Sequence, residues 1–226
     1  MSLKCELKLD WATHEAAKFA CIKWHYSKCL PTGKTVKVGV WENDVFKGVV
    51  IFSYGANNNS AKHFDLSQQE VCELTRVALH NHDAPVSRIL SIALKFLKKQ
   101  SPGIKVVFSY ADKSNQGHHG GIYQANGWTY LGERTTASKG AYYFINGKKM
   151  HGRSARAKYG SEKLFPKGWT HAPSETKHLY VKILDPEYKL KHSVKSYPKR
   201  ASSIDSDASG FHSEQGSANL TDALQT

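Results

Sequence analysis

The sequence predicts an α+β fold in which a mixed, mostly antiparallel central sheet is flanked by helices. Segments with the alternation of strands and segments with helical spacing follow one another along the chain. Two β-rich runs are joined by a short polar turn, and a later run is apolar almost throughout, as in a central strand covered on both faces. With 226 residues and 40% hydrophobic content, we expect one sizeable core and therefore one domain.

The first half of the chain predicts a strand, a helix and a hairpin. Leu3 to Leu9 alternates apolar and polar residues, and Thr13 is the expected N-cap of the helix that follows. Val36 to Trp41 and Val45 to Tyr54 are β-rich and flank Glu42-Asn43-Asp44, whose composition favours a hairpin turn. We expect an exposed loop to follow this hairpin.

The middle of the chain predicts a strand, helix, strand and helix. Val71 to Leu79 is the first strand, and Pro85 is suited to be the first residue of a helix that ends near Gln100. Lys105 to Ala111 is the apolar central strand, and Gly120 to Asn126 is a short helix.

Two further strands and a tail complete the prediction. Trp128 to Glu133 and Ala141 to Asn146 are expected to pair as a second antiparallel hairpin, and Lys177 to Leu184 is expected to join the same sheet. Residues 1–188 are thus assigned to a single domain. Residues 189–226 are rich in Ser, Asp and Gly and predict a disordered tail.

Charge points to a polyanionic partner. The net charge is +13, and because residues 201–226 contain four acidic residues and no Lys or Arg, residues 1–200 carry +17. A basic surface can also serve solubility alone. The basic residues gather at about 148–170, which favours an arm that follows the phosphates of a nucleic acid. The expected phosphate contacts are Lys148, Lys149, Arg153, Arg156 and Lys158.

Cysteine usage and hydropathy bear on the compartment. The four cysteines form no CxxC pair, and the N-terminus is too short and charged for a secretory leader, so we expect reduced thiols in the cytoplasm. No apolar run approaches the roughly 18 residues of a membrane helix, so no membrane association is expected.

Five motifs carry a resemblance to known proteins. They are WHY at Trp24–Tyr26, CELTRVAL at Cys72–Leu79, SYAD at Ser109–Asp112, GGIYQANGW at Gly120–Trp128 and HGRSARAKYGS at His151–Ser161. The order of elements resembles the GNAT N-acyltransferase superfamily, and the five motifs are similar to those of the phage Mom family, which has the same fold. The resemblance implies a phage- or prophage-encoded enzyme of the bacterial host cytoplasm. It would convert the N6 amine of adenine in duplex DNA to a carbamoylmethyl derivative, which protects phage DNA from restriction.

Two candidate catalytic residues lie on one predicted strand. Glu73 and Arg76 fall on opposite faces of an ideal strand because their offset is odd, and a β-bulge would bring them together. By resemblance to the superfamily, a carboxylate on this strand is a general base for the attacking amine. The alternative is that Glu73 and Arg76 form a structural ion pair.

Four more candidates follow from the resemblance. His25 and Tyr26 match the Mom family's His-Tyr pair, while Asp112 and Tyr123 match its acidic residue after the central strand and its helix tyrosine. The resemblance also implies a divalent metal such as iron, for which His25 and Asp112 are the candidate ligands. His25 can instead simply end a helix beside an aromatic ring, and Tyr123 can be a general acid or a core aromatic.

The donor of the transferred group is left open by the sequence. A GNAT enzyme holds the coenzyme A pyrophosphate with a glycine-rich loop before a helix, whereas residues 80–88 contain no glycine and place Asp83 there. Backbone amides at Val86, Ser87 and Arg88 could still bind an anion, so acetyl-CoA and a different donor both remain.

Two other functions compete with DNA modification. An ordinary GNAT N-acyltransferase would use acyl-CoA on a protein or small-molecule amine, and a DNA-binding protein without catalysis could use the same scaffold. Oligomeric state, including a homodimer, is left open.

Overall fold

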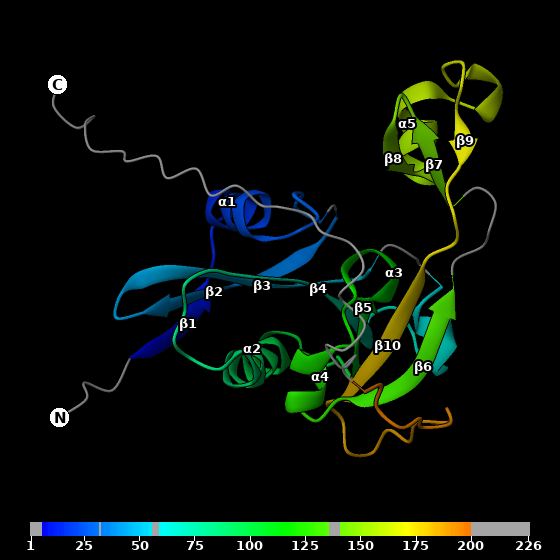
Figure 1. Ribbon diagram of the computed structural model, residues 1–226. Helices are drawn as coiled ribbons and strands as arrows, with labels where there is room; N and C mark the ends of the chain where they lie inside the picture. Colours follow the sequence, from blue (N-terminus) through cyan, green and yellow to red (C-terminus); the bar gives the residue numbers. More distant parts are fainter. Residues whose placement is uncertain (1–5, 32, 56–58, 136–140, 200–226) are drawn as a thin grey trace, which may run out of the picture.

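The computed structural model describes residues 6–31, 33–55, 59–135 and 141–199. Within these residues, seven strands form the central sheet in the order β1-β2-β3-β4-β5-β10-β6, and three strands form a small sheet in the order β8-β7-β9. Figure 1 shows that the small sheet of β7, β8 and β9 belongs to a lobe that projects from the central sheet. The described part contains no helix of the length and apolarity needed to cross a membrane.

The N-terminal elements follow the prediction closely. They are β1 (Leu7–Trp11), α1 (His14–Trp24), β2 (Thr35–Glu42) and β3 (Val45–Ser53). The Thr13 hydroxyl accepts the Ala16 amide at 3.1 Å, which confirms the N-cap. Asn43 and Asp44 both have positive φ, as a tight hairpin turn requires. Of the predicted first strand, residues 3–5 lie outside the described residues.

The middle of the central sheet contains one parallel pair of strands. After the 3₁₀ turn η1 (Ala61–Phe64), β4 (Val71–Leu79) runs antiparallel to β3 and parallel to β5 (Val106–Asp112), with α2 (Val86–Gln100) as the crossover. Pro85 is the residue that precedes α2, not its first residue, although the predicted end of the helix is confirmed. The β4–β5 pairing covers only the first three residues of each strand, after which no pairing joins them.

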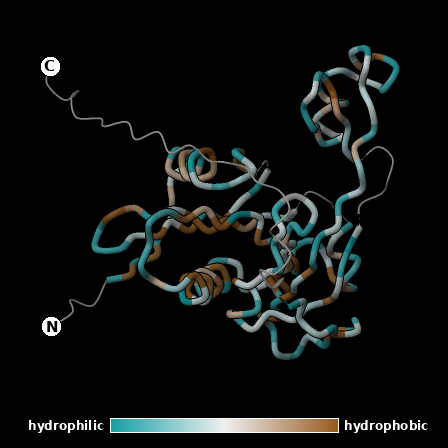
Figure 2. The backbone as a smooth tube through the Cα atoms, viewed as in Figure 1, coloured by the Kyte–Doolittle hydropathy of each residue, from teal (hydrophilic) through white to brown (hydrophobic). Residues whose placement is uncertain are grey.

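The helices cover opposite faces of the sheet. Figure 1 shows α1 above and α2 below the strands, and Figure 2 shows hydrophobic backbone positions concentrated between them. The α1 face buries Ala17, Ala20 and Cys21 against Val49 and Ile51. The larger core lies on the α2 side, where residues such as Ile89 and Leu97 pack on the sheet.

The C-terminal half corrects one predicted pairing. β10 (Thr176–Ile183) lies between β5 and β6 (Thr129–Thr135) and is antiparallel to both. β6 therefore does not pair with β7 (Tyr142–Ile145), as the sequence suggested; β7 pairs with β8 (Lys148–His151) and β9 (Thr170–His171). The physical reason is that the Asn146-Gly147 turn, with positive φ at both residues, gives β7 a local partner. The short helices α3 (Lys113–Gln116) and α4 (Gly121–Ala125) connect β5 to β6.

The basic segment 148–170 belongs to a folded lobe, which also contains β7 and β9. It contains β8, α5 (Gly152–Tyr159) and the 3₁₀ turn η2 (Glu162–Leu164). Tyr143, Ile145, Ala155 and Phe165 form its own small core. The predicted DNA-contacting residues of this segment therefore belong to β8 and α5.

The described chain remains packed beyond the predicted domain boundary at residue 188. The Lys195 amide donates to Tyr130 O at 2.9 Å, and the Tyr197 hydroxyl donates to Trp128 O at 2.6 Å. Residues 189–199, which were expected to belong to a disordered tail, thus contact Tyr130 of β6 and Trp128 just before it. Residues 200–226 lie outside the described residues.

Candidate active site

A cavity of about 630 Å³ opens where β4 and β5 separate. The end of α1, the α3–α4 loop and the start of β10 complete its wall. All six predicted catalytic residues line it: His25, Tyr26, Glu73, Arg76, Asp112 and Tyr123. Residues from four separate parts of the chain thus converge on one space, of a size typical of ligand pockets.

The predicted bulge on β4 is present. Ile51 of β3 is paired with Arg76 and Phe52 with Leu74, which leaves Thr75 as the extra residue. The Thr75 hydroxyl donates to Ile51 O at 3.0 Å and fixes the bulge. As a result, Glu73 and Arg76 both line the cavity despite their odd spacing.

Glu73 and Arg76 are held by different surroundings. A Cβ atom at Gly55 would lie 2.6 Å from a carboxylate oxygen of Glu73, so this glycine leaves the room that the carboxylate occupies. The Arg76 guanidinium donates to Thr75 O at 2.7 Å and to Cys29 O at 3.2 Å. Arg76 thereby ties the loop after α1, which carries His25, to the bulged strand.

His25 is buried and neutral. Its Nδ1 accepts the Ser27 amide at 3.1 Å, and because a backbone N–H can only donate, the proton of the neutral ring lies on Nε2. Burial, followed by the positive charge of Arg76 and by His118 and Lys28, lowers the pKa of His25 to about 4. His25 therefore offers an N–H donor at neutral pH.

The two predicted metal ligands fit a metal centre poorly. Nδ1 of His25 is engaged by the Ser27 amide, and Nε2 carries the proton that a metal would have to replace. Among the described residues there is no cluster of three or more His, Cys, Asp or Glu that could hold a metal ion. In the described part of the chain, His25 and Asp112 therefore do not belong to a group of three such ligands, which a protein metal centre usually contains.

Tyr26 and Asp112 form one polar side of the cavity. The Tyr26 ring lies 4.3 Å from the His25 ring and 5.9 Å from the His118 ring, measured between centroids. Asp112 ends β5 and is buried. Burial and then the negative charge of Asp112 raise the pKa of Tyr26, which stays protonated at neutral pH.

Tyr123 is both a core aromatic and a cavity residue. Ser109 Oγ donates to Leu74 O at 2.7 Å and therefore accepts the Tyr123 hydroxyl proton at 2.8 Å. Burial raises the pKa of Tyr123 to about 12, despite the opposing hydrogen bond to Ser109. Tyr123 thus keeps its proton and can release it only to a strong base.

Lys177 is a cavity residue that sequence reasoning missed. It lies opposite Asp112 in the β5–β10 register, and its Nζ is 3.4 Å from Glu175, whose other carboxylate oxygen contacts Lys149 Nζ at 2.7 Å. Burial opposes a charged Lys177, yet Tyr142 and these carboxylates raise its pKa. The sequence alone could not indicate that Lys177 lies beside Asp112, because this placement depends on the pairing of β5 with β10.

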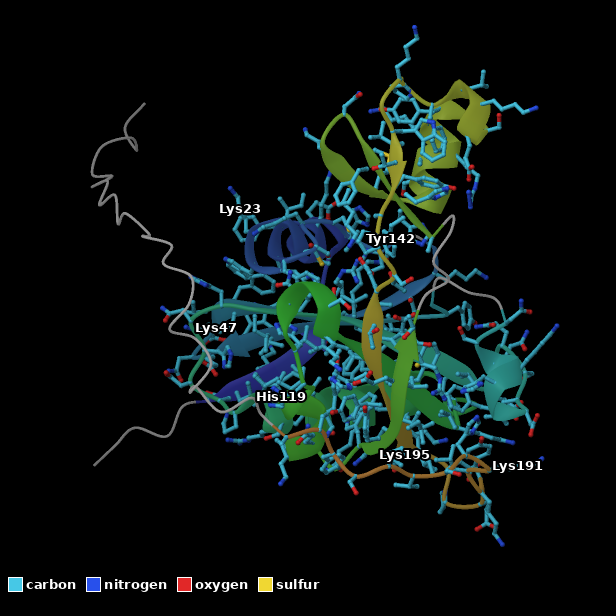
Figure 3. All side chains as sticks on the ribbon, turned by 45° about the vertical axis from the view of Figure 1, so that its right-hand side comes forward. Lys23, Lys47, His119, Tyr142, Lys191 and Lys195 are labelled. Atoms are coloured by element: carbon cyan, nitrogen blue, oxygen red, sulfur yellow. The ribbon has the colours of Figure 1, made fainter. Side chains whose placement is uncertain are left out.

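The Glu175 cluster joins the lobe to the cavity. Glu175 is 3% exposed, and its two lysine partners come from β8 of the lobe and β10 of the central sheet. Figure 3 shows Tyr142 where the lobe meets the sheet, and both lysines lie over its ring. The basic lobe and the cavity are therefore neighbours.

Lys148, Lys149, Arg156 and Lys158 are all exposed, and two of these predicted DNA contacts also make contacts within the protein. Arg156 donates to the Tyr143 hydroxyl at 3.0 Å, and Lys149 contacts Glu175, so both also hold the lobe together. Lys148 and Lys158 are exposed on the lobe surface. Arg153 belongs to α5, but its side chain lies outside the described residues.

The predicted cofactor residues do not reach the cavity. Val86, Ser87 and Arg88 begin α2 and are absent from the described cavity wall. The Arg88 amide, expected to be open to a ligand, donates to Pro85 O at 2.9 Å. The start of α2 thus fits the coenzyme A pyrophosphate poorly.

Comparisons with solved structures return acetyltransferases at low similarity. A GNAT-family acetyltransferase from Streptococcus pneumoniae has 12% identity and a TM-score of 0.43, covering 79% of this chain and 99% of its own. A ribosomal-protein alanine acetyltransferase from Vibrio fischeri has 12% identity and a TM-score of 0.44, covering 84% of this chain and 99% of its own. These values are too low to indicate what this chain acts on.

Sequence comparisons are more specific. The methylcarbamoylase Mom of Escherichia phage Mu is 29% identical over 151 residues, which is 65% of this chain and 60% of the phage Mu protein. The chain thus spans less than two thirds of that relative. The profile of the Mom protein family matches residues 6–199, which include the central sheet, the cavity and the lobe. The chain belongs to the Mom protein family.

Proposed function

We propose that this chain is a DNA-modifying enzyme that transfers a carbamoylmethyl group to the N6 amine of adenine in double-stranded DNA. In a phage-infected bacterium, acting in the cytoplasm, it would protect phage DNA from restriction. The observation that carries the proposal is the convergence of all six candidate residues on one cavity beside a basic lobe, in a chain of the Mom family. The phage Mu relative is a methylcarbamoylase, which supports a transferred group of this composition.

The transfer needs one bond to form, one to break and one proton to leave. N6 of adenine forms a bond to the donor's methylene carbon while the bond from that carbon to a leaving group breaks, and the leaving group takes the electron pair. N6 loses one proton. Because the N6 lone pair is delocalised into the ring, the amine is a poor nucleophile and requires a positioned base.

The cavity residues divide this work by their proton states. Glu73, a carboxylate beside the bulge, is assigned as the acceptor of the N6 proton. His25 presents Nε2–H and can donate to an adenine ring nitrogen. Tyr123, with a pKa of about 12, is suited to protonate a strongly basic leaving group. Asp112 and Tyr26 orient the amine from the opposite wall.

The lobe supplies the binding energy for DNA. Reaching N6 in a duplex requires extrusion of the adenine, which costs a few kcal/mol. Exposed Lys148 and Lys158 can neutralise phosphates near the cavity, and Tyr159 or Trp169 of the lobe can stack on a displaced base. The net charge of +13 for the whole chain is consistent with this partner.

Mass spectrometry of nucleosides from cells that express the chain tests the proposal. We expect a deoxyadenosine that is heavier by a carbamoylmethyl group with the wild-type chain and with Asp10→Ala, an exposed β1 control. We expect its loss with Asp112→Ala. Unmodified DNA from wild-type cells would sink the proposal, and acylation of protein or of small amines in those cells would favour an ordinary N-acyltransferase.

A further inference from the structure

The loop between β4 and α2 is closed by a carboxylate from another strand. Glu42, the last residue of β2, is 2% exposed. Its Oε1 accepts the Ala84 amide at 2.7 Å, and its Oε2 accepts the Asp83 amide at 2.8 Å. A second contact of 3.1 Å joins the Asp83 amide to Oε1. This glutamate thus binds the loop through backbone groups alone.

Glu42 is ionised in this position. Burial would raise its pKa, but the amides of Asp83 and Ala84, with the charges of Lys47 and His82, lower the pKa below its ordinary value. A fixed negative charge therefore lies on the amides that precede α2. Backbone amides before a helix are ordinarily a place where a protein binds a ligand's phosphate.

The loop offers little else to a phosphate. Asp83 and Ala84 donate to Glu42, and Pro85 has no N–H. The Asp83 side chain adds a second carboxylate to this short segment. Ser87 O accepts the Asn126 side-chain amide at 2.8 Å, so the first turn of α2 is packed against the residue that follows α4. A pyrophosphate here would meet two negative charges, and the amides of Asp83, Ala84 and Arg88 are already engaged.

We propose that the carbamoylmethyl donor is a small molecule without a nucleoside diphosphate, and not a coenzyme A thioester, and that Glu42 takes the place of the cofactor's phosphate. This inference rests on the proposed function. The donor is an acetamide unit whose methylene carbon bears a small leaving group, and it is taken up whole in the cavity beside the extruded adenine. A cavity of about 630 Å³ has room for these two groups together.

Direct binding tests the exclusion of coenzyme A without any variant. The purified full chain is titrated calorimetrically with coenzyme A and acetyl-CoA at millimolar concentration, with a coenzyme A-dependent acetyltransferase as positive control. We expect no saturable heat from this chain. Saturable binding that Arg88→Ala weakens tenfold or more would overturn the proposal, because it would place the phosphates at the start of α2.

Reconstitution identifies the donor class. Duplex DNA is incubated with the chain and a low-mass cell extract from which charcoal has removed nucleotides and coenzyme A. We expect adenine modification to persist, and acetyl-CoA alone to give none. Modification supported by acetyl-CoA alone would overturn the donor inference while leaving DNA modification intact. Unmodified DNA inside living cells would instead be a failure of the proposed function.

Glu42→Gln separates the role of charge from that of shape. The variant keeps an oxygen acceptor for one amide but removes the negative charge. We expect a lower melting temperature than that of Glu6→Gln, an exposed control next to β1, and unchanged modification if the variant folds. A loss of modification at full stability and unchanged DNA affinity would show that Glu42 contacts the donor, which contradicts the proposal.

Discussion

The cavity and the lobe differ in how the chain builds them. The cavity takes His25, Glu73, Asp112 and Tyr123 from distant segments, and burial shifts the pKa of His25 to about 4 and that of Tyr123 to about 12. The lobe is one continuous segment with a small aromatic core and exposed lysines. Proton transfer needs desolvated, fixed groups, whereas phosphate binding needs charges that remain at the surface. Changes in the two regions should therefore have separable effects.

The largest expected effect is the loss of the base in the cavity. Glu73→Gln removes the proton acceptor and should lower the rate of DNA modification by about 10²–10⁴-fold. Affinity for duplex DNA should not change, because the lobe is untouched. The rate is measured by nucleoside mass spectrometry, and the matched control is exposed Glu187→Gln. Equal losses of rate and affinity would show that cavity and lobe are one binding surface.

The neutral state of His25 predicts a pH dependence of stability. The folded pKa of about 4 is below the unfolded value of 6.5, so the unfolded chain binds the proton first as pH falls. This contribution to stability is complete above pH 6.5 and is lost between pH 6.5 and 4. From the shift to about 4, we expect a loss of about 2 kcal/mol between pH 7.5 and 5 that His25→Gln does not show. Urea denaturation at the two pH values measures it, and identical losses in both proteins would contradict the assignment.

Lys177 tests the connection between the two regions. Lys177→Met should lower the modification rate about tenfold, as expected for the loss of a hydrogen bond to a charged group. Lys182→Met is the control, because Lys182 lies on the same strand but donates to Asn126 O and Gly127 O. Lys177→Arg should recover part of the rate. A melting temperature lowered without a change in rate would reduce Lys177 to a structural role.

The smallest effect is expected from the exposed lysines of the lobe. Lys148→Ala with Lys158→Ala should reduce the slope of log affinity against log salt by about 1.8, since each phosphate contact contributes about 0.9. The modification rate at saturating DNA should be unchanged. A variant with Arg153, Arg156 and Lys158 changed to Ala should lose more affinity, but Arg156 also donates to Tyr143 and its loss can loosen the lobe. An unchanged salt slope in the double variant would dismiss the lobe as the DNA contact.

The helix cap, the hairpin turn and the helix α2 were predictable because each depends on interactions between residues close in the sequence. The Thr13 cap, the Asn43-Asp44 turn and the apolar period of α2 each follow from neighbouring residues, and the structure has all three. A bulge was the condition under which Glu73 and Arg76 could come together despite their odd spacing, and it is present. The resemblances to the GNAT superfamily and to the Mom family supplied six candidate residues, and they share one cavity, although their roles stay predictions.

What the sequence could not provide depends on pairing between distant segments. Nothing local indicates that β10 enters between β5 and β6, yet this insertion brings Lys177 opposite Asp112. In the sequence, Ser109 is a single polar residue in an apolar strand, and only the fold makes it the acceptor of the Tyr123 proton. The sequence placed Glu42 in a hairpin turn and gave no sign of its contact with the loop before α2.

The sequence by itself therefore determined the family, the order of the central elements and the basic character of the segment 148–170. Only the tertiary structure decided that this segment is a separate lobe, that β7 leaves the central sheet, and that Glu42 occupies the amides before α2. The physical reason is that the composition and the hydrophobic periodicity of a segment determine only the structure of a few neighbouring residues. Strand register and buried hydrogen bonds are instead selected by the whole chain, which must satisfy every buried polar group at once.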